Sequence, residues 1–240
     1  MMDMIRLDKY LSSQLGCSRT DAKKLLREKR ITVNGDVTVK GELLLDPAAV
    51  CVCKDGQRIQ YEKYVYIIQN KPAGVVSASS APGDVTVIDI LPEAMKRKDL
   101  FPAGRLDKDT TGLMLITDDG AFAHEILSPA HHVEKIYLVT LERAVTPQEA
   151  QKIAAGLVTE DERYKPAVLR PADTKAEHPQ YEIVLTEGRY HQIKRMFTFL
   201  CNRVCALHRT KIGGLALPES LAPGESRKLA PEEIKRINLL

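Results

Sequence analysis

The residues best suited to chemistry lie in a short segment where charged side chains stand directly before an apolar run. Residues 103–120 read AGRLDKDTTGLMLITDDG. The polar half carries two carboxylates and two cations: Asp107, Asp109, Arg105 and Lys108. The run Leu113–Thr117 has the length of a buried strand, and the following Asp-Asp-Gly is a turn signal. A loop that leads straight into a buried strand is a common way to present one side chain rigidly from a scaffold, and Asp107 has that setting.

Two interpretations of Asp107 follow from the residues and their spacing alone. An isolated Asp in a turn usually accepts hydrogen bonds from nearby backbone amides and does nothing else. Asp107, Asp109 and Thr111 also have the D-x-D-x-T spacing of metal-dependent phosphatases. That chemistry places the first Asp after a hydrophobic strand, where it meets a metal and a phosphate. Here the apolar run follows the Asp, so the order speaks against a phosphatase.

Length and composition restrict the class of protein. A chain of 240 residues has room for one or two domains with a packed core. No apolar stretch approaches the length of a membrane span, and the charged N-terminus lacks the apolar core of a signal peptide, so we expect a cytoplasmic protein with no membrane partner. An odd number of cysteines indicates reduced thiols.

The cysteines and histidines do not form a metal pattern. Cys51 and Cys53 alternate as in a strand, and Cys201 and Cys205 have the spacing of one helical turn, but neither pair has partner ligands nearby. We therefore expect buried core cysteines. The adjacent His131 and His132 cannot both face one metal from a regular element, so we assign no metal.

The positive charge of the chain is unevenly distributed. The net charge is +3. The first 60 residues hold 11 Lys and Arg against 8 Asp and Glu, whereas the rest of the chain holds 24 of each. A second local excess lies in residues 186–215, with six cations and one acid. Such local excesses indicate a polyanionic partner, although a solvated surface would look the same.

The first 60 residues predict two helices and a hairpin. Residues 6–15 have apolar positions at helical spacing, and Ser18 is a good N-cap for a second helix over residues 19–28 with Asp21 in its first turn. Ile31–Val33 alternates as a strand and Asn34-Gly35 predicts a tight turn. The text RLDKYL…SRTDAKKLLREKRITVNG resembles the S-four RNA-binding domain over roughly residues 4–60. The resemblance implies that cations on and after the second helix contact RNA phosphates: Arg19, Lys23, Lys24, Arg27 and Arg30.

The central segment resembles the pseudouridine synthases that act on ribosomal RNA. GRLDKDTTGLMLITDDG is similar to their central motif, and the resemblance makes Asp107 the nucleophile and gives Arg105 a role in holding RNA or filling the space of the extruded base. Residues 128–142, SPAHHVEKIYLVTLE, resemble a second motif. Lys135–Leu141 alternates as a strand, so Tyr137 could simply be a core residue. The resemblance implies instead that Tyr137 stacks on the target base and takes part in the later deprotonation.

The third matching segment is EGRYHQIKRMF, followed by LHRTKIGGLAL. The resemblance implies that Lys194 pairs with the catalytic Asp and that Ile193 lines the uracil pocket. Many family members carry Arg at this position, and a Lys keeps the charge without the bidentate geometry. Arg189 lies in the same basic segment, and we expect it to contact RNA.

The resemblance implies a complete reaction without cofactor or metal. A uridine within RNA is flipped out, its glycosidic bond breaks, the uracil turns, and a carbon–carbon bond forms. One carboxylate can serve, either by attacking the anomeric carbon or by assisting loss of the base, and a cation such as Lys194 favours its ionised form. The motifs are most similar to members acting on one uridine of 16S rRNA in an assembling small subunit. A 23S rRNA enzyme and a non-catalytic RNA-binding assembly factor are the alternatives.

The predicted fold class is α+β. We expect an S-four-like RNA-binding domain over residues 1–62. A larger pseudouridine synthase domain with a mixed, mostly antiparallel sheet would follow over residues 63–240, and we expect the protein to be a monomer. The resemblance covers nearly the whole chain.

Overall fold

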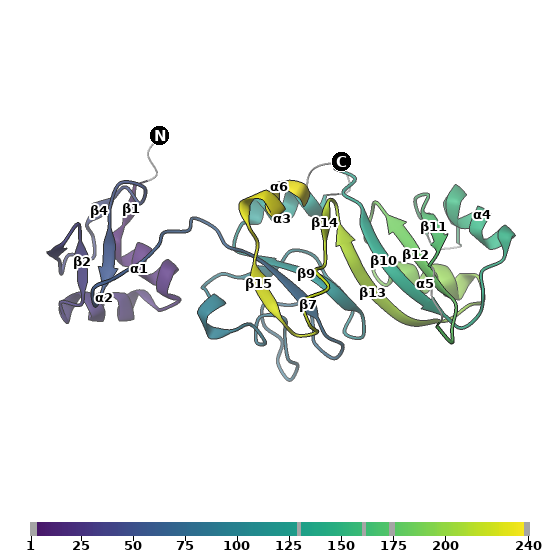
Figure 1. The fold of residues 1–240 in the computed structure, drawn as a ribbon, viewed down its shortest axis with the longest axis horizontal. Coiled ribbons are helices and arrows are strands. Elements are labelled where there is room, and N and C mark those ends of the chain that lie inside the picture. The colour runs from purple at the N-terminus through teal and green to yellow at the C-terminus, as the bar shows by residue number, and fades with distance from the viewer. Residues whose placement is uncertain (1–3, 129–130, 160–161, 173–175, 238–240) are drawn as a thin grey trace. The chain divides into compact units, whose positions relative to one another are not determined.

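The computed structural model describes residues 4–128, 131–159, 162–172 and 176–237. Their contacts divide the chain into two compact units, drawn as ribbons in Figure 1. The smaller unit contains residues 4–65 and Pro92–Leu100, a segment that includes the 3-10 helix η1 (Glu93–Met95). The larger unit contains Tyr66–Leu91 and residues 101–237.

The smaller unit contains the predicted helix pair and hairpin. Its helices are α1 (Leu7–Leu15) and α2 (Arg19–Arg27). Its strands are β1 (Ile5–Arg6), β2 (Ile31–Val33), β3 (Asp36–Val37), β4 (Leu44–Leu45), β5 (Val52–Lys54) and β6 (Gln57–Arg58). The capping role of Ser18 is confirmed, since its hydroxyl accepts from the Asp21 amide and the Asp21 carboxylate accepts from the Ser18 amide. The strand order β3-β2-β5-β6 is entirely antiparallel.

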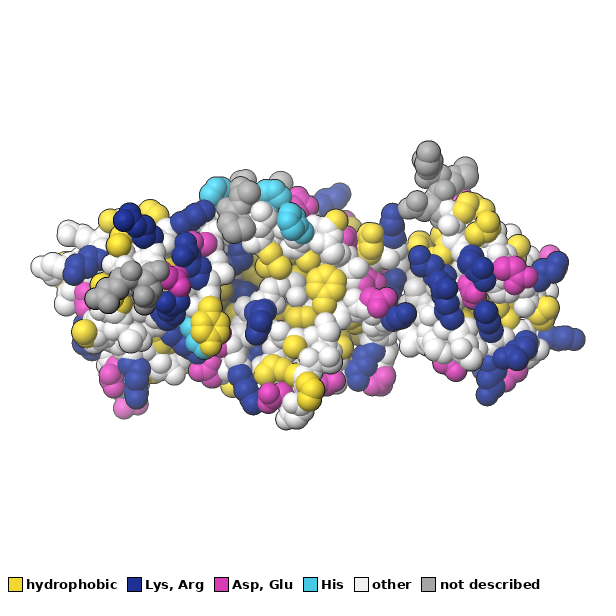
Figure 2. All heavy atoms as spheres, turned by 180° about the vertical axis from the view of Figure 1, so that it is seen from behind, with side chains coloured by type: hydrophobic (Ala, Val, Ile, Leu, Met, Phe, Trp, Pro, Cys, Tyr) yellow, Lys and Arg dark blue, Asp and Glu magenta, His cyan; other side chains and the backbone are white. Residues whose placement is uncertain are grey.

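The helix faces explain how this unit exposes its charge. Leu7 and Leu11 of α1 pack with Leu26 of α2 and Ile31 of β2, all essentially free of solvent contact. The cations of α2 occupy the opposite side and are exposed. Figure 2 shows Lys and Arg side chains gathered over the surface of this unit.

The larger unit is built on a nine-stranded sheet. Seven of its strands follow one another in the order β11-β12-β10-β13-β9-β7-β15, and the other two, β14 and β8, pair with β13 and β9. The strands are β7 (Tyr66–Lys71), β8 (Phe101–Pro102), β9 (Thr111–Thr117), β10 (Lys135–Leu141), β11 (Val168–Pro171), β12 (Gln180–Leu185), β13 (Val204–Ile212), β14 (Leu215–Ala216) and β15 (Ser226–Lys228). Among the described strand pairs, only β9 and β13 run parallel. The predicted α+β class with a mostly antiparallel sheet is confirmed.

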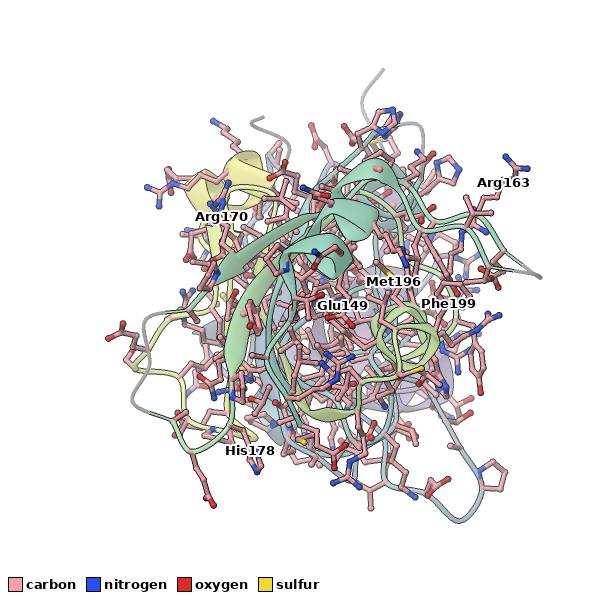
Figure 3. The ribbon with its side chains drawn as sticks, turned by 90° about the vertical axis from the view of Figure 1, so that its right-hand side faces the viewer. Glu149, Arg163, Arg170, His178, Met196 and Phe199 are labelled. Carbon is pink, nitrogen blue, oxygen red and sulfur yellow. The ribbon has the colours of Figure 1, made fainter. Side chains whose placement is uncertain are left out.

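The helices of the larger unit are α3 (Gly120–Leu127), α4 (Pro147–Ala155), α5 (Gln192–Phe199) and α6 (Pro231–Ile237). One hydrophobic cluster joins Leu113 and Leu115 of β9 to Ile126 of α3 and Ile237 of α6. On α5, Met196 is fully buried whereas Phe199 is 47% exposed, and Figure 3 shows both residues on this helix. The buried side of α5 thereby fixes its N-terminal end, which carries Ile193 and Lys194.

Strand β13 is longer than the sequence indicated. The pattern of residues 203–208 predicts a strand, but the observed strand begins at Val204 and continues to Ile212, so that it includes Arg209. Pairing on both sides explains the difference, because β13 contacts β10 along its length and β9 at His208 and Arg209. Gly112 permits the close approach of β9, since a Cβ atom there would lie 2.3 Å from the Arg209 carbonyl oxygen.

The prediction of core cysteines is wrong for Cys201 and Cys205. Cys201 follows α5 with a positive φ of 53°, and Cys205 lies in β13, so the two do not share a helical turn. Both are exposed. Cys51 and Cys53 are half-buried with their sulfur atoms 3.9 Å apart. The described residues hold no group of three or more His, Cys, Asp or Glu arranged to bind a metal ion.

Candidate active site

The loop that carries Asp107 is fixed by buried side chains on both sides of it. The Ser77 hydroxyl donates to the Leu106 carbonyl at 2.8 Å and accepts from the Leu106 amide at 3.0 Å. The ammonium of Lys71, a residue with no exposed surface, donates to the carbonyls of Lys108 at 3.2 Å and Thr110 at 2.8 Å. Burial lowers the pKa of Lys71 to about 8. These contacts hold the backbone on either side of Asp107 in one conformation.

Two side chains from α5 and the turn before it contact the Asp107 carboxylate. Lys194 Nζ lies 3.1 Å from Oδ2, and His191 Nε2 lies 3.3 Å from Oδ1. Lys194 also donates to Asp109 Oδ1 at 2.6 Å. Burial lowers the pKa of Lys194, but its bonds to Asp109 and Asp107 outweigh this and leave the pKa raised. The hydrogen bond from Lys194 in turn lowers the pKa of Asp109.

His191 has an unusual backbone conformation at the start of α5. Its φ of 49° and ψ of 33° lie in the left-handed region, which non-glycine residues seldom adopt. It occupies the N-cap position, yet its side chain makes no capping hydrogen bond to the described residues of α5. The imidazole is directed to Asp107 instead, and strained backbone of this kind is often found at functional sites.

Asp107 lines a pocket of about 840 Å³ in the larger unit. Its lining includes Arg105, Asp107, Tyr137, His191, Ile193 and Lys194. Ile193 and Tyr137 are 3% and 8% exposed and supply apolar surface, whereas Arg105 is exposed at the border. Figure 2 shows the larger unit with a hollowed face, in which hydrophobic side chains form the floor and cations stand around it. A partly apolar cleft with a few convergent polar groups is the usual form of a small-ligand site.

Tyr137 shares the pocket with two buried cations, of which Arg209 lies near its ring. The alternation of β10 directs both Tyr137 and Lys135 to the pocket side of the sheet. The guanidinium carbon of Arg209, which is 3% exposed, lies 5.9 Å from the Tyr137 ring centroid. Lys135 donates to the Val133 carbonyl at 2.9 Å, and burial, assisted by the charge of Arg209, lowers the pKa of Lys135 to about 8. The Tyr137 hydroxyl forms no hydrogen bond with the described side chains, unlike that of an ordinary core tyrosine.

Among the six cations of the basic segment over residues 186–215, Arg189, Arg195 and Arg209 are paired with acids or buried. Arg189 bonds Glu187 and Glu162, both at 3.2 Å, and Arg195 also pairs with Glu162. Arg209 is buried. The local charge balance of the segment did not reveal this pairing, because Glu162 arrives from a distant part of the chain.

The cations predicted to bind RNA in the smaller unit differ in availability. Arg19, Lys23, Lys24 and Arg27 are all exposed on α2. Arg30 is instead held by Asp55, with its Nε 2.9 Å from Oδ1 and its Nη2 2.6 Å from Oδ2. The structure therefore brings Asp107, Tyr137, Ile193, Lys194 and Arg105 to one pocket, and α2 carries a separate group of cations.

Three residues of the pocket were not foreseen. Lys135 shares the face of Tyr137 at strand spacing, which was a usable signal. Arg209 lies just beyond the strand that the sequence predicts, and its approach to Tyr137 depends on the pairing of β10 with β13. His191 has no signal from spacing, because its contact with Asp107 joins residues 84 positions apart in the chain.

Comparison with known proteins agrees with this arrangement. Residues 65–199 match the family model described as RNA pseudouridylate synthase, and residues 5–41 match the S4 domain. The chain is similar to proteins named "Ribosomal small subunit pseudouridine synthase A". It is 44% identical to the one from Yersinia pestis, over 97% of this chain and 98% of that protein, and 43% identical to the one from Escherichia coli K12, over 97% and 100%.

A solved structure titled as a pseudouridylate synthase is also similar, with a TM-score of 0.66, 37% identity, and coverage of 97% of this chain and 99% of that one. In the described residues no helix is long and apolar enough to cross a membrane. Both the length of the matches and their identity exceed what a shared fold alone requires, and the chain therefore belongs to the RNA pseudouridylate synthase family, with an S4 domain at its N-terminal end.

Proposed function

We propose that this protein converts a specific uridine of 16S rRNA to pseudouridine, with Asp107 as the catalytic carboxylate. The observation that carries the proposal is the fixed Asp107 carboxylate, held by Lys194 and His191 at the edge of a pocket that Tyr137 and Ile193 line. Choice of 16S rRNA is supported by relatives named for the small subunit that match nearly the whole chain.

Each step of the isomerisation has a suitable residue. Asp107 attacks the anomeric carbon or assists departure of the base, and Lys194 places a positive charge 3.1 Å from its Oδ2. Tyr137 stacks on the extruded uracil, and Ile193 covers the ring from the apolar wall. After the uracil has turned and C5 has bonded to the sugar, C5 loses its proton, and the Tyr137 hydroxyl is the candidate acceptor. N1 gains a proton, so the reaction is a net isomerisation.

RNA recognition is assigned to two regions. Arg19, Lys23, Lys24 and Arg27 on α2 contact phosphates and position the protein on RNA. Arg105 and Arg189 lie beside the pocket, where a phosphate of the target strand would pass. We further propose that residues 1–62 and 63–240 are the two domains, and that the protein works as a cytoplasmic monomer without cofactor.

The test is conversion of rRNA by purified protein, followed by mapping of pseudouridine in 16S and 23S rRNA. Asp107→Asn is expected to lower the single-turnover rate by roughly 10⁴-fold or more, with RNA affinity nearly unchanged, because the amide keeps the shape but loses the nucleophile. Asp109→Asn is the comparison variant: Asp109 also contacts Lys194, but its side chain is 73% exposed, so we expect a much smaller loss of rate, caused only by the changed position of Lys194. Substantial turnover by Asp107→Asn would show that Asp107 is not the catalytic carboxylate. Modification of 23S rRNA alone would overturn the 16S assignment, and no product at all would favour a non-catalytic assembly factor.

A further inference from the structure

Next to Asp107, an aromatic ring stands exposed on a fixed support. The Tyr190 side chain is 74% exposed, although its ring lies against the His191 ring with centroids 3.8 Å apart and planes 19° apart. Single exposed aromatic residues are common and need no explanation by themselves. Tyr190 differs because its ring orientation is set by a neighbour that is itself held in place.

The support for the ring is continuous with the catalytic carboxylate. His191 is held by its left-handed backbone and by the 3.3 Å contact between Nε2 and Asp107 Oδ1. Tyr190 rests on His191, and both residues line the same pocket as Asp107. The outer face of the Tyr190 ring meets no second ring or cation among the described residues. One ring face is therefore pre-oriented and open beside the place where a nucleotide must enter.

We propose that the Tyr190–His191 stack binds an unpaired RNA base adjacent to the uridine that enters the pocket. This inference rests on the proposed function and adds a second base contact to it. A flipped nucleotide remains joined to its neighbours, so one of them lies at the pocket mouth when the uridine reaches Asp107. RNA bases in single-stranded segments stack on exposed aromatic side chains, and a ring already held flat loses little entropy on binding.

The stack would also couple recognition to catalysis. A base pressed on Tyr190 is supported by His191, and His191 contacts the carboxylate that performs the reaction. The pocket volume of about 840 Å³ lies toward the upper end of the ~300–1,000 Å³ range of ligand sites, which leaves room for contacts beyond one uracil. The base that Tyr190 receives would then help to select which uridine is modified.

The test uses full-length protein with a 16S rRNA fragment that the wild type converts. Tyr190→Leu is expected to weaken fragment binding about 5- to 100-fold, whereas Tyr190→Phe, which keeps the ring, stays within about twofold. Phe199→Leu is the matched control, because Phe199 is also an exposed aromatic residue, at the other end of α5, but does not line the pocket. Melting temperatures should be unchanged in all three variants, since both side chains are exposed.

Fragments with an abasic site directly 5′ or 3′ of the target uridine identify the stacked base. At one of the two positions the abasic site should weaken binding to the wild type but cause no further loss in Tyr190→Leu. The inference would be overturned if Tyr190→Leu bound the fragment as tightly as the wild type does. It would also be overturned if, at both positions, the affinity lost through the abasic site added fully to the affinity lost through Tyr190→Leu. Equal losses in Tyr190→Phe and Tyr190→Leu would also overturn it, because they would assign binding to the hydroxyl. Failure of the proposed function would be separate and visible as the absence of pseudouridine from the wild-type reaction.

Discussion

Lys194 bridges two carboxylates of one loop, with its Nζ 3.1 Å from Asp107 Oδ2 and 2.6 Å from Asp109 Oδ1. The shorter contact is made to the more exposed Asp109, so the two acids do not share the ammonium equally. Asp109 fixes the position of Lys194, and Lys194 presents its charge to Asp107. A Lys can serve here because its ammonium contacts both acids from one position.

We expect Lys194→Met to lower the isomerisation rate by about 10²-fold or more, because Asp107, the carboxylate that we propose to react, loses its fixed counter-charge. Lys194→Arg should retain most of the activity. Single-turnover product formation at saturating protein measures both variants. Activity close to wild type in Lys194→Met would show that His191 alone suffices beside Asp107.

The same bridge should affect stability within a defined pH window. Because the pKa of Asp109 is lowered in the folded protein, its ionised carboxylate stabilises the fold. This stabilisation is complete above the unfolded carboxyl pKa of about 4 and is lost as the pH falls through the folded pKa. Because the pKa of Lys194 is raised in the folded protein, its charged form also stabilises the fold. This stabilisation is complete below the unfolded lysine pKa of about 10 and is lost as the pH rises through the folded pKa. Between these limits we expect a coupling energy of only about 0.5–1 kcal/mol in a double-mutant cycle of Lys194→Met and Asp109→Asn, because Asp109 is solvated.

Tyr137→Phe and Tyr137→Leu should separate the possible roles of that ring. If Tyr137 stacks on the extruded uracil, its ring contributes on the order of 1–3 kcal/mol of base binding, which Phe keeps and Leu loses. A proton-transfer role predicts that Phe binds and cleaves but stalls before release of the product. RNA affinity, single-turnover product and melting temperature are measured together. Equal loss of stability in both variants, with activity following the folded fraction, would make Tyr137 an ordinary core residue.

The cations of α2 should determine the salt dependence of RNA binding. We expect the triple variant Lys23→Gln, Lys24→Gln, Arg27→Gln to reduce the slope of log K against log salt by about 0.7 for each RNA phosphate that is no longer neutralised. Arg30→Gln is the control, because the bidentate contact with Asp55 already occupies that guanidinium. Binding isotherms at several salt concentrations test the difference. A slope unchanged in the triple variant, or reduced equally by Arg30→Gln, would contradict the assignment.

Lys135→Met should stabilise the fold at neutral pH. The folded pKa of Lys135, about 8, lies below the unfolded value of 10.5, so its burial penalty is complete below pH 8 and is relieved as pH rises toward 10.5. Removal of the charge should therefore raise the free energy of unfolding by roughly 1–3 kcal/mol at pH 7, a figure that includes the loss of the hydrogen bond to Val133. It should also flatten the rise in stability between about pH 8 and 10. Urea unfolding at several pH values measures this, with Lys152→Met on the exposed surface of α4 as the control. Identical pH slopes in Lys135→Met and the wild type would refute the lowered pKa.

The sequence by itself determined those features that depend on near neighbours. Ser18 and Asp21 specify a helix start within four residues, KIYLVTL specifies a half-buried strand by its alternation, and the order of loop and apolar run gives the setting of Asp107. The resemblance of the motifs to those of pseudouridine synthases added the reaction that they would perform together. These signals survive without a structure because each lies within one helix, one strand or one turn.

The tertiary structure decided what distant segments bring together. Arg209 became part of a strand because β9 and β10 pair with it from both sides, and two cations of the basic segment that follows residue 186, Arg189 and Arg195, pair with Glu162. His191 reaches Asp107 only because buried residues of α5 fix the start of that helix against the sheet. Composition and spacing cannot predict such contacts, since their geometry follows from the packing of whole elements and their energies from the burial that this packing creates.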